Sequence, residues 1–264
     1  MKFYGICFGF VSFCGSCHAA AVFVDLGTAA NFGVIGGSTV TNTGATVVDG
    51  DLGVSPGTAI TGLPIGSVSG TIDAGDAIAA QAQSDLTAAY NFAAAEACGD
   101  SLTGQNLGGL TLTPGVYCFS SSAQLTGTLT LNAEGNSNAV FLFEIGSTLT
   151  TASASSIVFI NSGQGGSLFW QVGSSATLGT TTAFEGNILA QTSITMNTGA
   201  TIECGRALAS NGAVTMDTNI VSIASTGGCE ATGAATVPEP GSAGLLGTGI
   251  FAGIAILLVR RFEA

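Results

Sequence analysis

The sequence predicts a mostly β protein: an irregular β-helix whose short strands form stacked coils, with one long α-helix packed alongside. Three features predict it, namely phrases that recur about every 20 residues, apolar residues that alternate with small polar ones, and a single alanine-rich interruption. The clearest repeat links "GNILAQTSITMNTG", which starts at Gly186, to "GRALASNGAVTMDTN", which starts at Gly205. Repeats of this length are typical of solenoids. Alternation alone would also suit a β-sandwich, but the repeated T-M-N-T and T-M-D-T phrases favour coils.

Residues 1–21 have the composition of a secretory signal peptide. Lys2 supplies a positive start, residues 3–13 are largely apolar, and small residues follow at Ala19 to Ala21. This order predicts export, with cleavage near Ala20 or Ala21. The exported domain is then expected over residues 22–230.

The alanine-rich segment predicts a helix over about residues 71–97, after a region of strands and turns that ends near residue 64. It contains no proline, and alanine has the highest helix propensity. An apolar stripe at helical spacing would face the solenoid. The residues of this stripe are Ala82, Leu86, Ala89, Tyr90 and Ala93.

From about Leu107 onward, strands with one buried face are expected, with glycines at the corners. In "SITMN" the alternation places Ile194 and Met196 inside, and Thr195 and Asn197 outside. In "AVTMD" it likewise places Val214 and Met216 inside and Thr215 outside. The outward residues that we select as a candidate binding surface are Thr128, Thr130, Thr148, Thr150, Thr177, Thr195, Asn197 and Thr215.

Four cysteines remain once the leader is removed. An even number of cysteines in an exported domain predicts two disulfides, for which three pairings exist. We favour the pairs that are local in sequence, Cys98 with Cys118 and Cys204 with Cys229. No two of these cysteines have the C-x-x-C spacing that would favour a metal site.

The C-terminal end consists of a linker over residues 231–241 and an apolar segment over residues 242–264. Pro238-Glu239-Pro240, an uncharged stretch of membrane-spanning length and the basic pair Arg260-Arg261 follow one another. This order resembles the PEP-CTERM sorting signal of diderm bacteria. The resemblance implies membrane contact through this segment only, recognition by an exosortase-like protease, and a location in the cell envelope, on the outer surface or in the extracellular matrix.

The charge of the chain argues against several classes of function. Three of the four basic residues lie in the two ends, so the domain keeps only Arg206 among many acids. Such a surface cannot neutralise phosphates, which excludes nucleic acid as a partner. The domain has no histidine or lysine to activate a serine nucleophile. Glu144 and Glu185 could form the acid–base pair of a sugar-cleaving enzyme. A domain with one tryptophan, Trp170, and one arginine has few residues to bind a sugar in a cleft. We therefore expect neither enzyme activity nor a cofactor or metal.

Several phrases resemble the DUF3494-type ice-binding protein family. They are the stretch over residues 26–62, the helix, "LTGQNLGGLTLTPGVYCFSSSAQLTGTLTLNAEG" over residues 102–135, and the second repeat phrase. The resemblance implies a right-handed β-helix of triangular cross-section, with the helix along one side. It also implies a flat face that adsorbs to ice and inhibits its growth or recrystallisation.

A lattice of threonines suits that role physically. Alternate residues along a strand lie roughly 6.6–6.8 Å apart and stacked strands about 4.7–4.9 Å apart, so the methyls and hydroxyls form a stiff grid. The β-branched side chain has few rotamers to lose on binding. We expect a monomer with the ice surface as its partner. The alternative is a non-catalytic scaffold or adhesion module of the cell surface or exopolysaccharide matrix, because a β-helix of this composition would serve either role.

Overall fold

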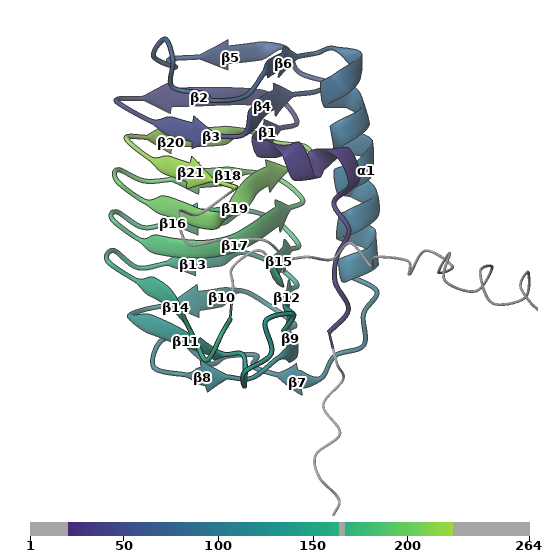
Figure 1. Ribbon diagram of the computed structural model, residues 1–264, viewed down its shortest axis with the longest axis vertical. Helices are drawn as coiled ribbons and strands as arrows, with labels where there is room; N and C mark the ends of the chain where they lie inside the picture. Colours follow the sequence, from purple (N-terminus) through teal and green to yellow (C-terminus); the bar gives the residue numbers. More distant parts are fainter. Residues whose placement is uncertain (1–20, 164–166, 224–264) are drawn as a thin grey trace, which may run out of the picture. The chain divides into compact units, whose positions relative to one another are not determined.

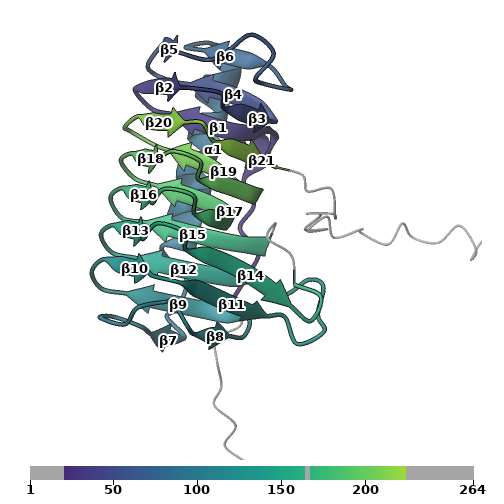
Figure 2. The same ribbon diagram turned by 90° about the vertical axis from the view of Figure 1, so that its left-hand side faces the viewer.

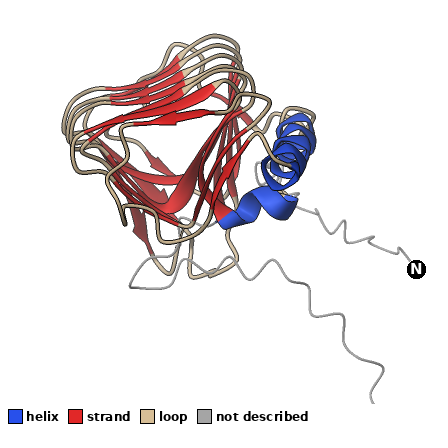
Figure 3. Ribbon diagram, turned by 90° about the horizontal axis from the view of Figure 1, so that it is seen from above, coloured by secondary structure: helices blue, strands red, loops and turns tan. Residues whose placement is uncertain are grey.

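The computed structural model describes residues 21–163 and 167–223, and these form a parallel β-helix with one helix along its side (Figure 1). Viewed down the axis on which the coils stack, the strands enclose a triangle (Figure 3). The predicted fold class is therefore confirmed. All the described residues belong to one compact unit. The predicted leader, linker and apolar tail lie outside the described residues, except for Ala21. No described helix is long and apolar enough to cross a membrane.

Three faces make up the triangle. The first, which we call the helix-side face, has in stacking order β6 (Ile72–Ala74), β4 (Asp51–Val54), β1 (Phe32–Gly36), β19 (Thr201–Ala209), β17 (Ala183–Ala190), β15 (Leu168–Val172), β12 (Phe141–Ile145), β9 (Gly115–Phe119) and β7 (Asp100–Ser101). The second, the open face, has β10 (Ala123–Leu125), β13 (Leu149–Thr151), β16 (Ala176–Leu178), β18 (Ile194–Met196), β20 (Val214–Asp217), β2 (Thr39–Thr43) and β5 (Ala59–Thr61).

The third face, the acidic face, carries Asp49, Glu185 and Glu203. Its strands are β8 (Thr111–Leu112), β11 (Thr128–Asn132), β14 (Ser156–Ile160), the first parts of β17 and β19, β21 (Ile220–Ser222) and β3 (Val47–Asp49). β17 and β19 turn the corner between two faces, and their mutual register shifts between Glu185 and Asn187. The open face and the acidic face are both visible in Figure 2.

The coils are not stacked in chain order. The N-terminal coils pair with the C-terminal ones, β1 with β19, β2 with β20 and β3 with β21. The helix α1 (Ala77–Ala93) then runs back along the stack to β7, from which the chain climbs again (Figure 1). The first strands and the last strands of the described chain thus share one end of the solenoid.

The helix is shorter than the predicted span of residues 71–97. Residues 72–74 form β6 and pair with β4, because a strand partner there outweighs local helix propensity. Asp76 caps α1 by accepting a hydrogen bond from the backbone of Ala79 at 2.9 Å. Most of the predicted stripe is buried, and only Tyr90 stays partly exposed.

Two hydrophobic cores hold the domain together. Inside the triangle, inward residues stack from coil to coil, as in Phe143 against Trp170 with ring centroids 4.1 Å apart. Ile194, Met196, Val214 and Met216 all point inward as predicted. The second core lies between the helix-side face, α1 and the N-terminal residues.

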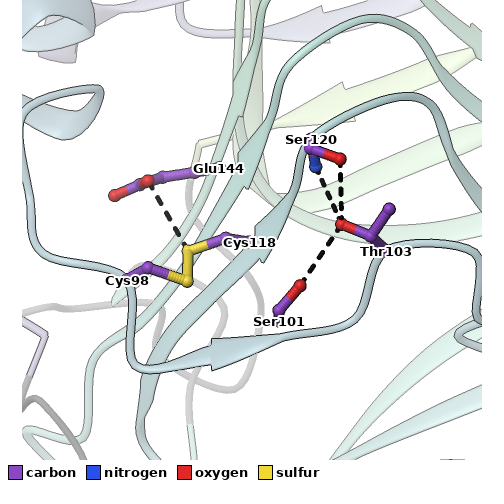
Figure 4. Close-up of a disulfide and its surroundings, with 6 residues drawn as sticks. All are labelled: Cys98, Ser101, Thr103, Cys118, Ser120 and Glu144. Carbon is purple, nitrogen blue, oxygen red and sulfur yellow. Dashed lines mark hydrogen bonds between the residues drawn. A yellow bond between two sulfur atoms is a disulfide. The ribbon is translucent and has the colours of Figure 1, made fainter.

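A disulfide joins Cys98, which follows α1, to Cys118 of β9, as the favoured pairing anticipated (Figure 4). It ties the segment that follows α1 to the helix-side face near β7. Cys204 is also disulfide-bonded. Its predicted partner Cys229 lies outside the described residues, so that pairing stays a prediction.

Candidate functional site

The open face carries one row of outward side chains at the centre of its strands. From β10 to β5 the register aligns Gln124, Thr150, Thr177, Thr195, Thr215, Thr41 and Thr61. We call the six threonines of this series the threonine row. Each of its six threonines is at least partly exposed. The row therefore places one methyl and one hydroxyl on each of six consecutive coils.

A second row stands two residues before the first in each coil, at the start of each strand or just ahead of it. Backbone hydrogen bonds that link successive coils at these positions confirm the alignment. This serine row contains Ser122, Thr148, Ser175, Ser193, Ala213, Thr39 and Ala59. Four of its hydroxyls take part in hydrogen bonds: Thr148 donates to Ser122 at 2.8 Å, Ser175 accepts from the backbone of Ser193 at 3.3 Å, and Ser193 accepts from the backbone of Ala213 at 3.3 Å.

The open face is almost free of charge. Asp217, at the end of β20, is the one ionisable residue in its seven strands. The Asp217 carboxylate accepts hydrogen bonds from the hydroxyls of Thr198 and Thr218 at the corner with the acidic face. It is therefore engaged at the edge of the face rather than at its centre.

Six of the eight residues selected from the sequence lie on this face. Thr150, Thr177, Thr195 and Thr215 belong to the threonine row and Thr148 to the serine row, while Asn197 follows β18 near the corner. The sequence did not show that β2 and β5 complete the row with Thr41 and Thr61. The Thr39-Val40-Thr41 alternation was the available signal. This alternation does not show that Thr41 pairs with Thr215, whose hydroxyl lies 3.3 Å from that of Thr41.

Thr128 and Thr130 do not join the other six. They lie on the acidic face, where Thr128 pairs with Ser156 and Thr130 with Thr111. The prediction that all eight residues form one surface is therefore wrong. The corner between the two faces falls near Gly127, just before β11, so the same T-x-T phrase starts the next face instead of lying on the open one.

The acidic face continues from these threonines to a pair of carboxylates. Glu185 of β17 lies in register with Glu203 of β19. Burial raises the pKa of Glu185 to about 7, and the Glu203 carboxylate beside it adds to the rise. Hydration of these carboxylates makes this face a poor match for a neutral lattice of water.

Glu144 and Glu185 cannot act together as an acid–base pair. Glu144 lies in β12 on the helix-side face, beside Cys118 (Figure 4), and Glu185 lies on the acidic face. Burial, with a smaller contribution from Glu96, raises the pKa of Glu144 to about 7. Within residues 21–163 and 167–223, no three His, Cys, Asp or Glu side chains converge as they would around a metal ion.

The one cation of the described chain, Arg206, is used inside the fold. Its guanidinium donates to the carbonyl of Ala30 through Nε at 2.9 Å and to Oδ1 of Asn187 through Nη1 at 2.7 Å. Arg206 therefore ties the N-terminal residues to the helix-side face and does not form part of an exposed basic surface.

Several known proteins are similar to this chain. A family model described as Ice-binding-like matches residues 34–222. A protein from Nostoc sp. (strain HG1) named ice-binding protein is 59% identical over 244 residues, which cover 91% of this chain and 88% of that protein. Another of that name, from Flavobacterium frigoris (strain PS1), is 37% identical, with 76% of each chain covered.

A solved structure gives the same result. The crystal structure of an ice binding protein from an Antarctic biological consortium is 49% identical to this chain and superposes with a TM-score of 0.75. The superposition covers 77% of this chain and 92% of the other. The chain belongs to the Ice-binding-like family.

Proposed function

We propose that this protein binds ice through the open face and thereby inhibits the growth or recrystallisation of ice. The threonine row carries the proposal, because six coils present the same side chain in register on a face nearly free of charge. The names of the relatives support it. The role needs no chemical step, and we propose that the domain is not an enzyme.

The row and its backbone together form a rigid template. Stacked strands set a spacing of about 4.7–4.9 Å along the row, and the two rows stand roughly 6.6–6.8 Å apart. Threonine χ1 has few wells, and four hydroxyls of the serine row are already hydrogen-bonded, so ordering on contact with ice loses little entropy. Methyls can then seat among ordered waters while hydroxyls bond to them.

The other two faces are less suited to this role. The helix-side face is covered by α1 and the N-terminal residues. The acidic face carries Asp49, Glu185 and Glu203. The open face is the one of the three that is both uncovered and almost uncharged.

Export and C-terminal sorting belong to the same proposal. The leader over residues 1–21, the Pro-Glu-Pro linker and the apolar tail over residues 242–264 support delivery to the envelope or the surroundings of a diderm cell, with an exosortase-like protease acting on the tail. We propose that the domain over residues 22–230 acts as a monomer, because a planar site on one face needs no second copy.

Ice shaping by residues 22–231 tests the proposal. The purified domain should facet growing ice crystals and give a freezing gap at micromolar concentration. Thr195→Tyr should abolish most of that gap, because a bulky ring at the centre of the row holds the remaining threonines away from the ice. Its unfolding midpoint should stay within about 2 °C of the parent, since the position is on the surface.

The matched control is Thr130→Tyr, the same change on the acidic face, which should keep full activity. If Thr130→Tyr is the variant that loses activity, the wrong face has been chosen. If the parent domain neither shapes ice nor suppresses recrystallisation, the surface-scaffold role replaces ice binding.

A further inference from the structure

The disulfide between Cys98 and Cys118 lies against a carboxyl group that has no part in the proposed ice-binding face. Glu144 of β12 pairs in register with Cys118 of β9, so both side chains belong to the helix-side face. Oε2 of Glu144 lies 3.7 Å from Sγ of Cys118 (Figure 4). Oε1 of Glu144 is buried and finds no hydrogen-bond donor among the described residues. The carboxyl group thus faces a sulfur atom through one oxygen and lacks a donor at the other.

The state of the disulfide decides whether Cys118 can donate to Glu144. A disulfide sulfur carries no hydrogen, whereas a thiol has one to donate. Reduction would place an S–H group beside Glu144, because β9 pairs with both β7 and β12 and holds Cys118 in place. A hydrogen bond to a carboxylate favours its charged form. The protonation of Glu144 therefore depends on whether the disulfide is closed.

The groups around Glu144 let it change charge near neutral pH. Burial raises the pKa of Glu144 to about 7 in the oxidised protein, with a smaller contribution from the Glu96 carboxyl group on the segment after α1. Gln171 of β15, which pairs with Glu144 on the next coil, is uncharged. Tyr90 of α1 hydrogen-bonds to Gln171, and burial raises the pKa of Tyr90 above its ordinary value of 10.0. Glu144 therefore titrates near neutral pH while Tyr90 and Gln171 do not.

We propose that Glu144 is a proton site coupled to the Cys98–Cys118 disulfide: it holds a proton while the bond is closed and releases it when the bond is reduced. The reductant is a dithiol, which supplies two electrons and two protons. The S–S bond of the protein breaks, two thiols form, the dithiol becomes a disulfide, and the Glu144 proton passes to water.

The direction of the coupling follows from the released proton. Acid favours the closed bond, and rising pH favours reduction until Glu144 is ionised in both states above about pH 7. The tie between the segment after α1 and the helix-side face thus becomes harder to reduce as the surroundings turn acid. This inference goes beyond the proposed function, because it concerns a face that does not carry the threonine row.

Equilibration with a dithiol tests the coupling. The purified protein is equilibrated with reduced and oxidised dithiothreitol at pH 5 and pH 7.5, and alkylation followed by mass spectrometry counts reduced Cys118. The equilibrium constant for reduction should rise about five- to tenfold over this interval. Glu144→Gln should make the constant independent of pH. Glu185→Gln is the matched control, because the pKa of Glu185 is also raised to about 7 but Glu185 lies on the acidic face, and it should keep the pH dependence of the parent.

A second measurement isolates the thiol. Carbon-13 NMR of the glutamate carboxyl groups gives the pKa of Glu144 in two variants that lack the disulfide. Cys98→Ser keeps the Cys118 thiol as a donor, whereas Cys98→Ser combined with Cys118→Ala removes it, so the pKa of Glu144 should be lower in the first variant by about 1.

Four results would overturn the proposal: equal pKa values of Glu144 in those two variants, a reduction constant of the parent that does not change with pH, a Glu144→Gln variant that keeps the pH dependence, or a Glu185→Gln variant that loses it. None of these measurements involves ice, so a failure of ice binding would leave the result standing.

Discussion

At the scale of single residues, the corner between the open face and the acidic face strains the chain. Successive coils turn there through left-handed residues: Gly44, Thr218, Gly199, Thr181 and Ala154 all have φ between 55° and 78°. Backbone hydrogen bonds join these positions from coil to coil. The left-handed region costs a residue other than glycine roughly 1–2 kcal/mol. The corner therefore stores strain wherever glycine is missing.

Two opposite substitutions measure that strain. Ala154→Gly should raise the free energy of unfolding by about 0.5–1 kcal/mol, because relief of the left-handed strain exceeds the added freedom of the unfolded chain. Gly199→Ala should lower it by about 1 kcal/mol, since the added Cβ would meet only Thr181 at 3.5 Å and φ alone opposes it. Chemical denaturation of both variants is the measurement. A loss of stability in Ala154→Gly would mean that the corner is not strained.

The same corner shows what a strand pattern can and cannot predict. Alternation correctly placed Ile194 and Met216 inside and Thr195 and Thr215 outside, because parity is a local property. It could not assign Thr130 to a face. That depends on how many residues have passed since the last corner, and the number varies among irregular coils.

At the scale of elements, β17 and β19 bring two carboxylates together at an unfavourable place. Folded Glu185 has its pKa raised to about 7 by burial and by Glu203, whereas the ordinary value is 4.5. The folded state therefore binds more protons than the unfolded state between about pH 4.5 and 7. Over that window the free energy of unfolding falls as pH rises, and above pH 7 the loss is complete.

Glu185→Gln should remove that loss. At pH 8 the variant should be more stable than the parent by about 1–2 kcal/mol, a value reduced from the full shift because the side chain is partly exposed. Thermal unfolding at pH 5.5 and pH 8 checks this. Glu203→Gln should recover a smaller part of the lost stability, because burial still raises the pKa of Glu185. Glu144 contributes a change of the same sign, so Glu144→Gln should flatten the profile further. A parent that is more stable at pH 8 than at pH 5.5 would contradict the assignment.

The helix marks another limit of element prediction. Its buried stripe followed from 3.6-residue spacing, but its start did not follow from propensity. Residues 72–74 became a strand because β4 offers them backbone partners on the neighbouring coil. That partner is a property of the stack, which the local sequence does not describe.

At the scale of the whole molecule, the chain closes on itself. The repeats predicted stacked coils correctly but did not identify which coils are neighbours. The N-terminal strand β2 pairs with β20, so Thr41 contacts Thr215, a residue 174 positions away in the sequence. Nothing in a 20-residue repeat identifies such a pairing, because each coil offers similar edges to any neighbour. The threonine row is complete only because the two ends meet, so fold closure and the candidate site depend on the same junction.

The junction makes the domain resistant to a cut in its middle. A protease site inserted between Ala94 and Ala97, after α1, would divide residues 22–231 into two fragments. They should co-elute at one copy each and still shape ice, because β1, β2, β3 and α1 all pack on the second fragment. The disulfide between Cys98 and Cys118 lies within the second fragment and cannot hold the two together.

The unfolding midpoint of the cut protein should rise with its concentration. Val40→Asp, which buries a charge at the junction, should let the fragments separate once cut. Separation of the unsubstituted fragments on a sizing column would show that the junction is weak and that the threonine row depends on chain continuity instead.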